Sequence, residues 1–236
     1  MANCNNEAGF RSKDFELIHF AIFAKYWEPG KVKTRLAKKV GAEAACEAYI
    51  RFLQHLVEQF AGVADRRTVV YSPGDAKEQF RAEIRSEWDL APQAEGDLGA
   101  RMKEFFASNA SEGQKNILIG SDTPNLSVDY INTVAQWLDE CDIVLGPSGD
   151  GGYYLIAMKD QWPGLFEGVA WSTDRVLPTT IEKAEALGAT YRLLPEMKDV
   201  DEFADLQRLM AELQDSDSQG DKQLLTELMQ LELPLE

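Results

Sequence analysis

Short apolar runs alternate with helical patterns through most of this sequence, and this alternation constrains the fold more than any other feature. The first run, Leu17–Ala24, is almost continuously apolar, as in a strand that is covered on both faces. Apolar residues with helical spacing follow over Gly41–Phe60. A repeated order of strand and helix predicts a mostly parallel sheet with helices on both faces, so we expect a three-layer α/β/α fold.

The alternation continues to residue 213, and residues 15–213 are predicted to form a single domain. Further strands are predicted at Arg67–Tyr71, Trp88–Leu90, Asn116–Gly120, Asp142–Leu145, Tyr153–Met158 and Thr190–Leu194. Further helices are predicted at Ala76–Ser86, Leu98–Asn109 and Ser127–Glu140, from the Trp171–Asp174 segment to Leu187, and at Glu202–Leu213. Residues 1–14 are interpreted as a disordered tail. Residues 214–236 are interpreted as a polar linker and an amphipathic helix, Lys222–Leu233, which either packs on its own sheet or pairs with a second subunit in a homodimer.

The overall charge argues against two classes of partner. The chain has 40 acidic and 24 basic residues and a formal charge of −16, which disfavours nucleic acid and anionic membranes. Its three cysteines are odd in number and have no zinc-site spacing, which favours a reduced compartment. No apolar run is long enough to span a bilayer, and the first residues do not have the pattern of a signal peptide. We therefore expect a cytoplasmic protein.

A cationic loop follows the first predicted strand, in spite of the acidic composition. Lys25, Lys31, Lys33 and Arg35 lie around a turn at Pro29-Gly30. Open α/β sheets hold phosphates at the carboxyl ends of their strands, so this loop is predicted to bind a di- or triphosphate through its cations and the backbone near Gly30. The spacing of a Walker A motif is absent. The alternative is a solvated basic face at a helix start, where positive charge opposes the helix dipole.

Acidic residues follow later strands and are candidates for a metal site. Asp122 lies in the turn Ser121–Pro124, directly after a buried strand, where a carboxylate can hold Mg²⁺ or Mn²⁺ against a pyrophosphate. The alternative is an aspartate that closes its own turn. Asp199 and Asp201 either complete this metal site or cap the helix that follows them.

Three glycine- or hydroxyl-bearing turns are further candidates for ligand binding, and each has a structural alternative. In the first, Gly96, Asp97 and Arg101 either approach a phosphate or form an ordinary helix start. In the second, Asp150 with Gly151 and Gly152 either faces a ligand or forms a tight hairpin. In the third, Trp171, Ser172 and Thr173 either supply a stacking ring and hydroxyls or cap a helix.

Histidine chemistry has little support in this sequence. His19 lies within the first predicted strand and His55 on a helix face, and neither accompanies a serine or cysteine nucleophile motif. His19 is interpreted as a core residue whose ring is hydrogen-bonded.

Taken in order, these turns resemble a known family. The motifs are K-x-x-x-P-G-x-V-K-T-R-L, G-D-L-G-x-R-M, S-D-T-P, G-P-S-x-D-G-G-Y-Y-L-I, W-S-T and D-V-D. Together they resemble the bacterial glycosyltransferase-like family linked to arsenosugar biosynthesis clusters, which is similar to phospholactate and molybdenum cofactor guanylyltransferases. The resemblance covers about Ile18–Leu206.

This resemblance implies a GT-A-like, Rossmann-type fold of the nucleotide-diphospho-sugar transferases. It implies that the cationic loop holds nucleotide phosphates and that Asp122 matches the metal-binding acid of the D-x-D motif. The second acid of that motif is replaced here by Pro124, so Asp150, Asp199 or Asp201 would supply the missing ligand. The family often has proline before Glu28, where this chain has Trp27.

Three functions are compatible with these features. The first is metal-dependent transfer of a sugar from a nucleotide diphosphate sugar to a small acceptor, in which Lys33 and Arg35 stabilise the departing diphosphate and Asp150 takes the acceptor's proton. The second is nucleotidyl transfer from a nucleoside triphosphate to a phosphorylated acceptor, with release of pyrophosphate. The third is nucleotide binding without turnover.

Overall fold

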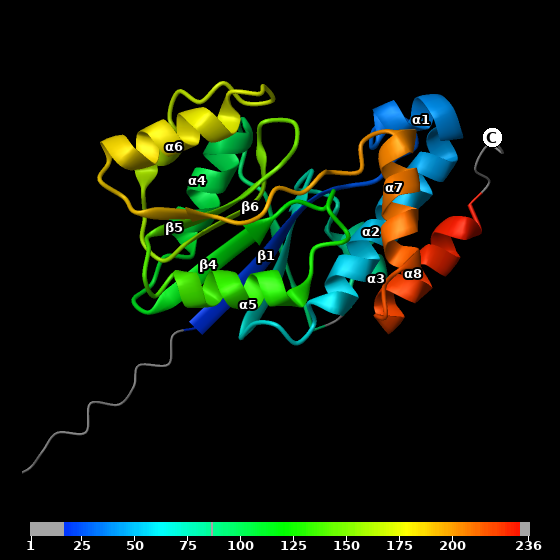
Figure 1. The fold of residues 1–236 in the computed structure, drawn as a ribbon, viewed down its shortest axis with the longest axis horizontal. Coiled ribbons are helices and arrows are strands. Elements are labelled where there is room, and N and C mark those ends of the chain that lie inside the picture. The colour runs from blue at the N-terminus through cyan, green and yellow to red at the C-terminus, as the bar shows by residue number, and fades with distance from the viewer. Residues whose placement is uncertain (1–16, 86, 232–236) are drawn as a thin grey trace, which may run out of the picture.

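The computed structural model describes residues 17–85 and 87–231, which are built around one seven-stranded sheet (Figure 1). The strands are β1 (Leu17–Lys25), β2 (Arg66–Ser72), β3 (Asp89–Pro92), β4 (Gln114–Ile119), β5 (Ile143–Pro147), β6 (Tyr153–Met158) and β7 (Tyr191–Leu193). Their order in the sheet is β3-β2-β1-β4-β6-β5-β7. β6 runs antiparallel to β4 and β5, and the other neighbouring pairs are parallel. The predicted mostly parallel sheet is confirmed.

Helices cover both faces of this sheet. They are α1 (Thr34–Val40), α2 (Ala42–Gln59), α3 (Lys77–Glu83), α4 (Leu98–Ser108), α5 (Val128–Trp137), α6 (Val176–Ala186), α7 (Phe203–Gln214) and α8 (Gln219–Met229), with a short 3₁₀ helix at Pro163–Phe166. Phe20 and Ile22 of β1 pack in one core cluster with α2, α3 and α5, whereas Ala21 packs in a second cluster with α4 and α6. Successive side chains of a strand point to opposite faces, so a strand between two helical layers needs the continuous apolar run seen in the sequence.

Several helix boundaries differ from the predicted ones, and α3 and α5 end three residues earlier than predicted, at Glu83 and Trp137. A short helix, α1, forms within the predicted cationic loop and is separated from α2 by Gly41, whose φ is 88°. The Trp171–Asp174 segment precedes α6 instead of opening it, because the helix begins at Val176. The last helix begins at Gln219, inside the predicted linker.

The last helix, α8, packs on the chain's own helices. Leu224 and Leu228 lie in a third core cluster with residues of α1, α2 and α7, and Figure 1 shows these helices side by side at one end of the sheet. The predicted disordered tail, residues 1–14, and the predicted end of the last helix, residues 232–233, lie outside the described residues. In the part of the chain that is described, no helix is both long enough and apolar enough to cross a membrane.

The strand order places a crevice between the ends of β1 and β4. From β1 the chain adds β2 and β3 on one side and then returns to add β4 on the other. A reversal of this kind opens a ligand-binding crevice outside the carboxyl ends of the two central strands. Tyr49 of α2 joins these ends, because its hydroxyl accepts a hydrogen bond from the backbone N of Lys25 (2.9 Å) and contacts Oγ of Ser121 (2.9 Å). Burial raises the pKa of this hydroxyl, which therefore stays protonated.

Candidate functional site

A cleft of about 470 Å³ occupies this crevice. All four predicted cations of the β1–α1 segment line it, together with Asp122 from the end of β4 and Asp201 from the segment before α7, and we call it the cationic cleft: Lys25, Lys31, Lys33, Arg35, Asp122 and Asp201. The predicted meeting of the cationic loop with the carboxylate after β4 is thus present in the structure.

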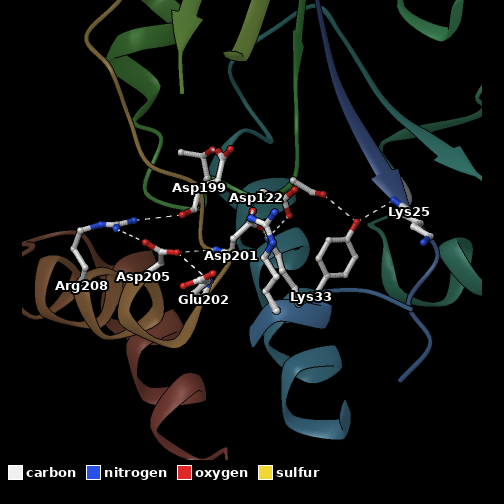
Figure 2. Close-up of polar contacts among 12 residues, drawn as sticks. Lys25, Lys33, Asp122, Asp199, Asp201, Glu202, Asp205 and Arg208 are labelled. Atoms are coloured by element: carbon white, nitrogen blue, oxygen red, sulfur yellow. Dashed lines mark hydrogen bonds and ion pairs between the residues drawn. The ribbon is translucent and has the colours of Figure 1, made fainter. Parts of the chain in front are cut away.

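Lys33 lies at the centre of the charged groups. Its side chain is only 3% exposed, and its Nζ lies 2.5 Å from Oδ1 of Asp122 and 3.3 Å from Oδ1 of Asp201 (Figure 2). Arg35 approaches the other oxygen of Asp201 at 3.7 Å and is largely exposed. Two carboxylates hold this amino group in position, so the cleft places basic and acidic side chains within contact distance of one another.

The backbone at Lys33 is unusual. Lys33 adopts the left-handed conformation (φ 46°, ψ 44°), and in the described part of the chain the only other non-glycine residue with positive φ is Ser172. Such conformations are costly for residues with a Cβ and gather at functional sites. Lys25 supports the loop from β1, since its Nζ donates to the backbone O of Lys31 at 2.9 Å.

Two hydrogen bonds dock the Asp199–Asp201 segment beside β4. The backbone N of Val200 donates to the backbone O of Asp122 at 2.9 Å, and Oγ1 of Thr123 donates to Oδ1 of Asp199 at 2.7 Å. The N-cap of α7 is Glu202, which forms a capping box with Asp205. The alternative interpretation, in which Asp199 and Asp201 cap this helix, is therefore wrong.

Asp199 is a perturbed carboxyl group. Burial raises its pKa to about 6, with Asp122 and Asp150 acting in the same direction, while the hydrogen bond from Thr123 and the charge of Lys33 oppose the shift. Asp199 therefore lies within electrostatic range of both Asp122 and Asp150. The described residues contain no group of three or more His, Cys, Asp or Glu side chains already arranged to hold a metal ion.

A second hollow of about 390 Å³ adjoins the cationic cleft and shares Arg35, Leu98 and Asp201 with it. The other predicted residues that line this second hollow come from the β5–β6 turn, from the segment before α6 and from the segment before α7: Asp150, Gly152, Trp171, Ser172, Thr173 and Asp199. The β5–β6 turn is a hairpin between antiparallel strands, so the hairpin interpretation is confirmed, and the position of Asp150 in the lining leaves its binding role as a prediction.

The β5–β6 turn fixes Asp150 through one of its carboxylate oxygens. Oδ1 accepts hydrogen bonds from Oγ of Ser148 (2.5 Å) and from the backbone N of Gly152 (3.0 Å). A side chain at Gly151 would lie 2.5 Å from the backbone of Asp174, so this glycine allows the two loops to touch. Asp150 itself is exposed to the hollow.

Trp171 is seated by a glycine on α4. A Cβ at Gly99 would lie 2.4 Å from Nε1 of Trp171, so only glycine permits this contact. Thr173 does not cap α6: its hydroxyl donates to the backbone O of Ala170 and accepts from the backbone N of Arg175, which turns the loop before the helix.

Three predicted residues before and within α4 lie outside the lining of both hollows. Asp97 caps α4, since its side chain accepts from the backbone N of Ala100 at 2.8 Å. Arg101 donates to the backbone O of Gly96 (2.9 Å) and to the side-chain O of Gln93 (3.2 Å). This turn is therefore an ordinary helix start, which is the structural alternative given in the sequence analysis. Gly30 likewise serves the turn of its loop, with φ 79°.

Sequence reasoning missed three residues at the site. Tyr49 had the spacing of a core residue in a helix, and nothing local marks its hydroxyl as the link between two strands. Gln93, which donates to the backbone O of Ala24 and Val70, lines the cationic cleft, and Asp174 lines the second hollow. Gln93 directly follows β3 and Asp174 lies shortly before α6, and this position at the end of a strand or the start of a helix was the available signal.

The chain matches the family described as "Uncharacterized protein conserved in bacteria (DUF2064)" over residues 56–173, which is half of its length. It also matches a protein of Desulfovibrio desulfuricans G20 that is provisionally named a nucleotide-diphospho-sugar transferase. The identity is 34%, the match covers 91% of this chain and 96% of the other, and the TM-score is 0.82. The chain belongs to the DUF2064 family.

More distant structures share the fold of this DUF2064 protein. One is CMP:2-keto-3-deoxy-manno-octonic acid synthetase complexed with CTP (14% identity, 84% and 98% of the two chains, TM-score 0.53). Another is Rv0371c of Mycobacterium tuberculosis H37Rv in complex with manganese (15% identity, 81% and 97%, TM-score 0.51). No curated protein matches the sequence. The expected α/β fold of nucleotide-diphospho-sugar transferases and nucleotidyltransferases is therefore shown.

Proposed function

We propose that this protein transfers a sugar from a nucleotide diphosphate sugar to a small acceptor. The observation that carries the proposal is the pairing of two adjoining hollows, one cationic and one containing Asp150, at the point where the strand order reverses. The relative at 34% identity, provisionally named as a nucleotide-diphospho-sugar transferase, supports the same class of donor.

In this proposal the cationic cleft binds the diphosphate. Lys33 and Arg35 contact its oxygens and stabilise the negative charge that develops as the nucleoside diphosphate departs. Lys33 is suited to this role because it is fixed by Asp122 and Asp201 before a ligand arrives. A side chain that is already in place before the reaction needs no free energy of reorganisation as the transition state forms.

The second hollow would hold the acceptor, with Asp150 as the general base. The acceptor oxygen attacks the anomeric carbon of the sugar, the bond from that carbon to the diphosphate oxygen breaks, and the diphosphate leaves with the electron pair. The proton of the acceptor hydroxyl passes to Asp150. Both hydrogen bonds that Asp150 accepts from the described residues are made by Oδ1, so in this proposal the other carboxylate oxygen, Oδ2, receives the proton.

A divalent ion, Mg²⁺ or Mn²⁺, belongs to the proposal, with Asp122 and Asp201 as its first candidates and Asp199 as a third. These are carboxylate ligands of the kind that both ions prefer, and two of them already share one positive charge, that of Lys33. The bound ion would supply additional positive charge next to the departing diphosphate.

A second candidate function is nucleotidyl transfer from a nucleoside triphosphate. The observation that favours it is the density of cations in one segment, because four basic side chains line the cationic cleft and a triphosphate carries more charge than a diphosphate. The fold is shared with a CTP-bound synthetase.

Thermal unfolding with a panel of nucleotides tests the proposal. UDP- and GDP-sugars are compared with GTP and CTP, each with Mg²⁺, with Mn²⁺ and with EDTA, since a ligand that binds the native state raises Tm by mass action. Larger shifts with nucleotide sugars support sugar transfer. Larger shifts with triphosphates, followed by pyrophosphate release on addition of a phosphorylated acceptor, support the second candidate, and no shift with any nucleotide contradicts both.

A cytoplasmic location, a link to arsenosugar biosynthesis and a homodimer remain predictions. Fractionation of the native cells, the genomic neighbourhood of the gene and the mass of the protein in solution test them in turn.

A further inference from the structure

The two hollows of the site differ in the sign of their charge. Among the described residues, the cationic cleft is lined by four basic side chains and by the carboxylates of Asp122 and Asp201. The second hollow is lined by one basic side chain, Arg35, and by the carboxylates of Asp150, Asp174, Asp199 and Asp201. The sign of the charge therefore changes from one hollow to the next, at the shared residues Arg35 and Asp201.

The wall of the second hollow is also partly apolar. Trp171, Tyr153 and Leu98 line it, and the side chain of Leu98 is exposed. Trp171 cannot settle closer to α4, because its ring already lies against the backbone of Gly99. Apolar and aromatic surfaces combined with a few polar groups are typical of sites for small organic ligands.

A negative hollow selects its ligand by charge. Hollows lined by one sign of charge concentrate ions of the opposite sign and exclude ions of the same sign. A phosphate ester or carboxylate would lose solvent there and face several carboxylates at short range, which is unfavourable. A neutral polyol or an amine meets no such penalty.

We propose that the second hollow takes a neutral or cationic, hydroxyl-bearing acceptor, such as a sugar or an amino alcohol, and excludes phosphorylated and carboxylated acceptors. This inference rests on the proposed function, since it assigns the acceptor class for the same reaction. It also separates the two candidate reactions, because nucleotidyl transfer as proposed above needs a phosphorylated acceptor.

The test measures the charge preference of the second hollow through the fluorescence of Trp171. Quenching by caesium, acrylamide and iodide is measured at equal ionic strength, the signal of Trp171→Phe is subtracted, and each constant is divided by that of N-acetyltryptophanamide. The titrations are run in EDTA and again with Mg²⁺. We expect the normalised constant for caesium to exceed that for iodide by about three- to tenfold in EDTA and by a smaller factor with Mg²⁺, whose charge would offset part of that of Asp199 and Asp201, with neutral acrylamide between them.

Two charge-reversal variants provide the comparison. Asp174→Lys changes an exposed side chain in the lining and should reduce the ratio of the caesium to the iodide constant by at least about twofold. Asp160→Lys makes the same change of charge at an exposed residue beyond the end of β6, at the opposite edge of the sheet, and should leave the ratio unchanged. Iodide quenching equal to or above caesium quenching in the wild type, in either condition, overturns the inference.

The acceptor class is then tested directly. With the nucleotide sugar that stabilises the protein most, release of nucleoside diphosphate is compared for a free sugar and its phosphate ester. A preference for the free sugar supports the inference and a preference for the ester overturns it. Failure of the proposed function looks different: no nucleotide would shift Tm, while the quenching ratio would still report the charge of the second hollow.

Discussion

Two turns of this protein occupy similar places in the fold and have different roles. The β1–α1 turn and the β3–α4 turn each follow a parallel strand, contain glycine and lead into a helix with an arginine in its first turn, Arg35 or Arg101. In the β3–α4 turn the polar groups satisfy one another, since Asp97 caps α4 and Arg101 binds the backbone O of Gly96. In the β1–α1 turn the N-cap residue, Lys33, makes no side-chain cap and instead contacts carboxylates from two distant segments.

This difference in side-chain contacts indicates which of the two turns binds a ligand. Side chains that complete their own turn have little binding capacity left, whereas Lys33 is held in a costly backbone conformation with its charge directed into a cleft. Position adds to this, because β1 borders the reversal of strand order and β3 lies at the edge of the sheet. Glycine and arginine content alone did not distinguish the two turns.

The largest expected effect is a loss of folding stability at low pH, and it comes from His19, on the face of the sheet that α4 covers. Burial lowers the pKa of His19 to about 4, and its ring lies between Asn116 and Thr68 and against Phe105 of α4. Between pH 6.5 and 4 the unfolded chain binds the proton and the folded chain does not. Stability is therefore lost as the pH falls through this window, by up to about 3 kcal/mol from this residue.

Urea unfolding from pH 7 to 4 measures this loss, with His19→Gln as the comparison. The wild type should lose more stability over this range than the variant, which keeps the smaller contribution of His55, a group whose pKa burial also lowers. Equal losses in the two proteins would contradict the assignment.

The next effect tests the contrast between the turns directly. Lys33→Ala should weaken nucleotide binding by roughly ten- to a hundredfold, because it removes a charged hydrogen-bond donor to phosphate. Arg101→Ala, the matched change in the other turn, should alter affinity by less than about twofold, since its partners belong to its own turn. Calorimetric titration measures both, and equal losses would remove the distinction between the turns.

A third prediction concerns the metal. Asp122→Asn should abolish the effect of Mg²⁺ or Mn²⁺ on nucleotide binding, because an amide oxygen is a weaker ligand for these ions than a carboxylate. Asp97→Asn, which alters the capping carboxylate of the other turn, should keep the metal response. Thermal shifts with nucleotide, measured with metal and with EDTA, distinguish the two variants. A metal response in Asp122→Asn that equals that of the wild type excludes Asp122 as a metal ligand.

A smaller effect is expected where α4 meets the second hollow. Gly99→Ala places a methyl group against the ring of Trp171 and should cost about 1–3 kcal/mol through overpacking, with a change in tryptophan emission. Gly62→Ala is the control, because a Cβ there meets nothing within 4 Å. Denaturant unfolding followed by fluorescence compares them, and similar stabilities would show that Trp171 can move away freely.

The smallest effect is the loss of the helix cap. Asp97→Ala should reduce stability by about 1 kcal/mol, since the backbone N of Ala100 loses its acceptor, and should leave nucleotide affinity unchanged. Chemical denaturation and nucleotide titration of the same variant give both quantities. A clear loss of nucleotide affinity in this variant would show that Asp97 contributes to binding.

Much of the fold was predictable because its strands are covered on both faces. The apolar run of β1 and the alternation of strands with helices were enough to predict a three-layer fold with a mostly parallel sheet. The start of α6 was misplaced, because Thr173 turns the loop with its hydroxyl, where a helix cap has the same local pattern. A threonine side chain fits both structures, and only packing decides between them.

The part of the site that directly follows the central strands was predictable from the sequence. Lys33 and Asp122 follow the two central strands, so sequence alone could place them at one edge of the sheet. The contact that docks Val200 on the backbone of Asp122 involves only main-chain atoms and leaves no trace in residue types. For the same reason, the function of Asp201 could not be separated from helix capping before the structure was known.

The hydrogen bond from Val200 to Asp122 has a consequence for how the protein becomes active during synthesis. The ribosome synthesises the Asp199–Asp201 segment more than 160 residues after Lys33, so the cleft is complete only once this later segment has been made. A product that stops before Val200 keeps the cations and Asp122 but lacks Asp201, the second carboxylate that positions Lys33. Shorter chains would therefore lack the proposed chemistry until the Asp199–Asp201 segment is made.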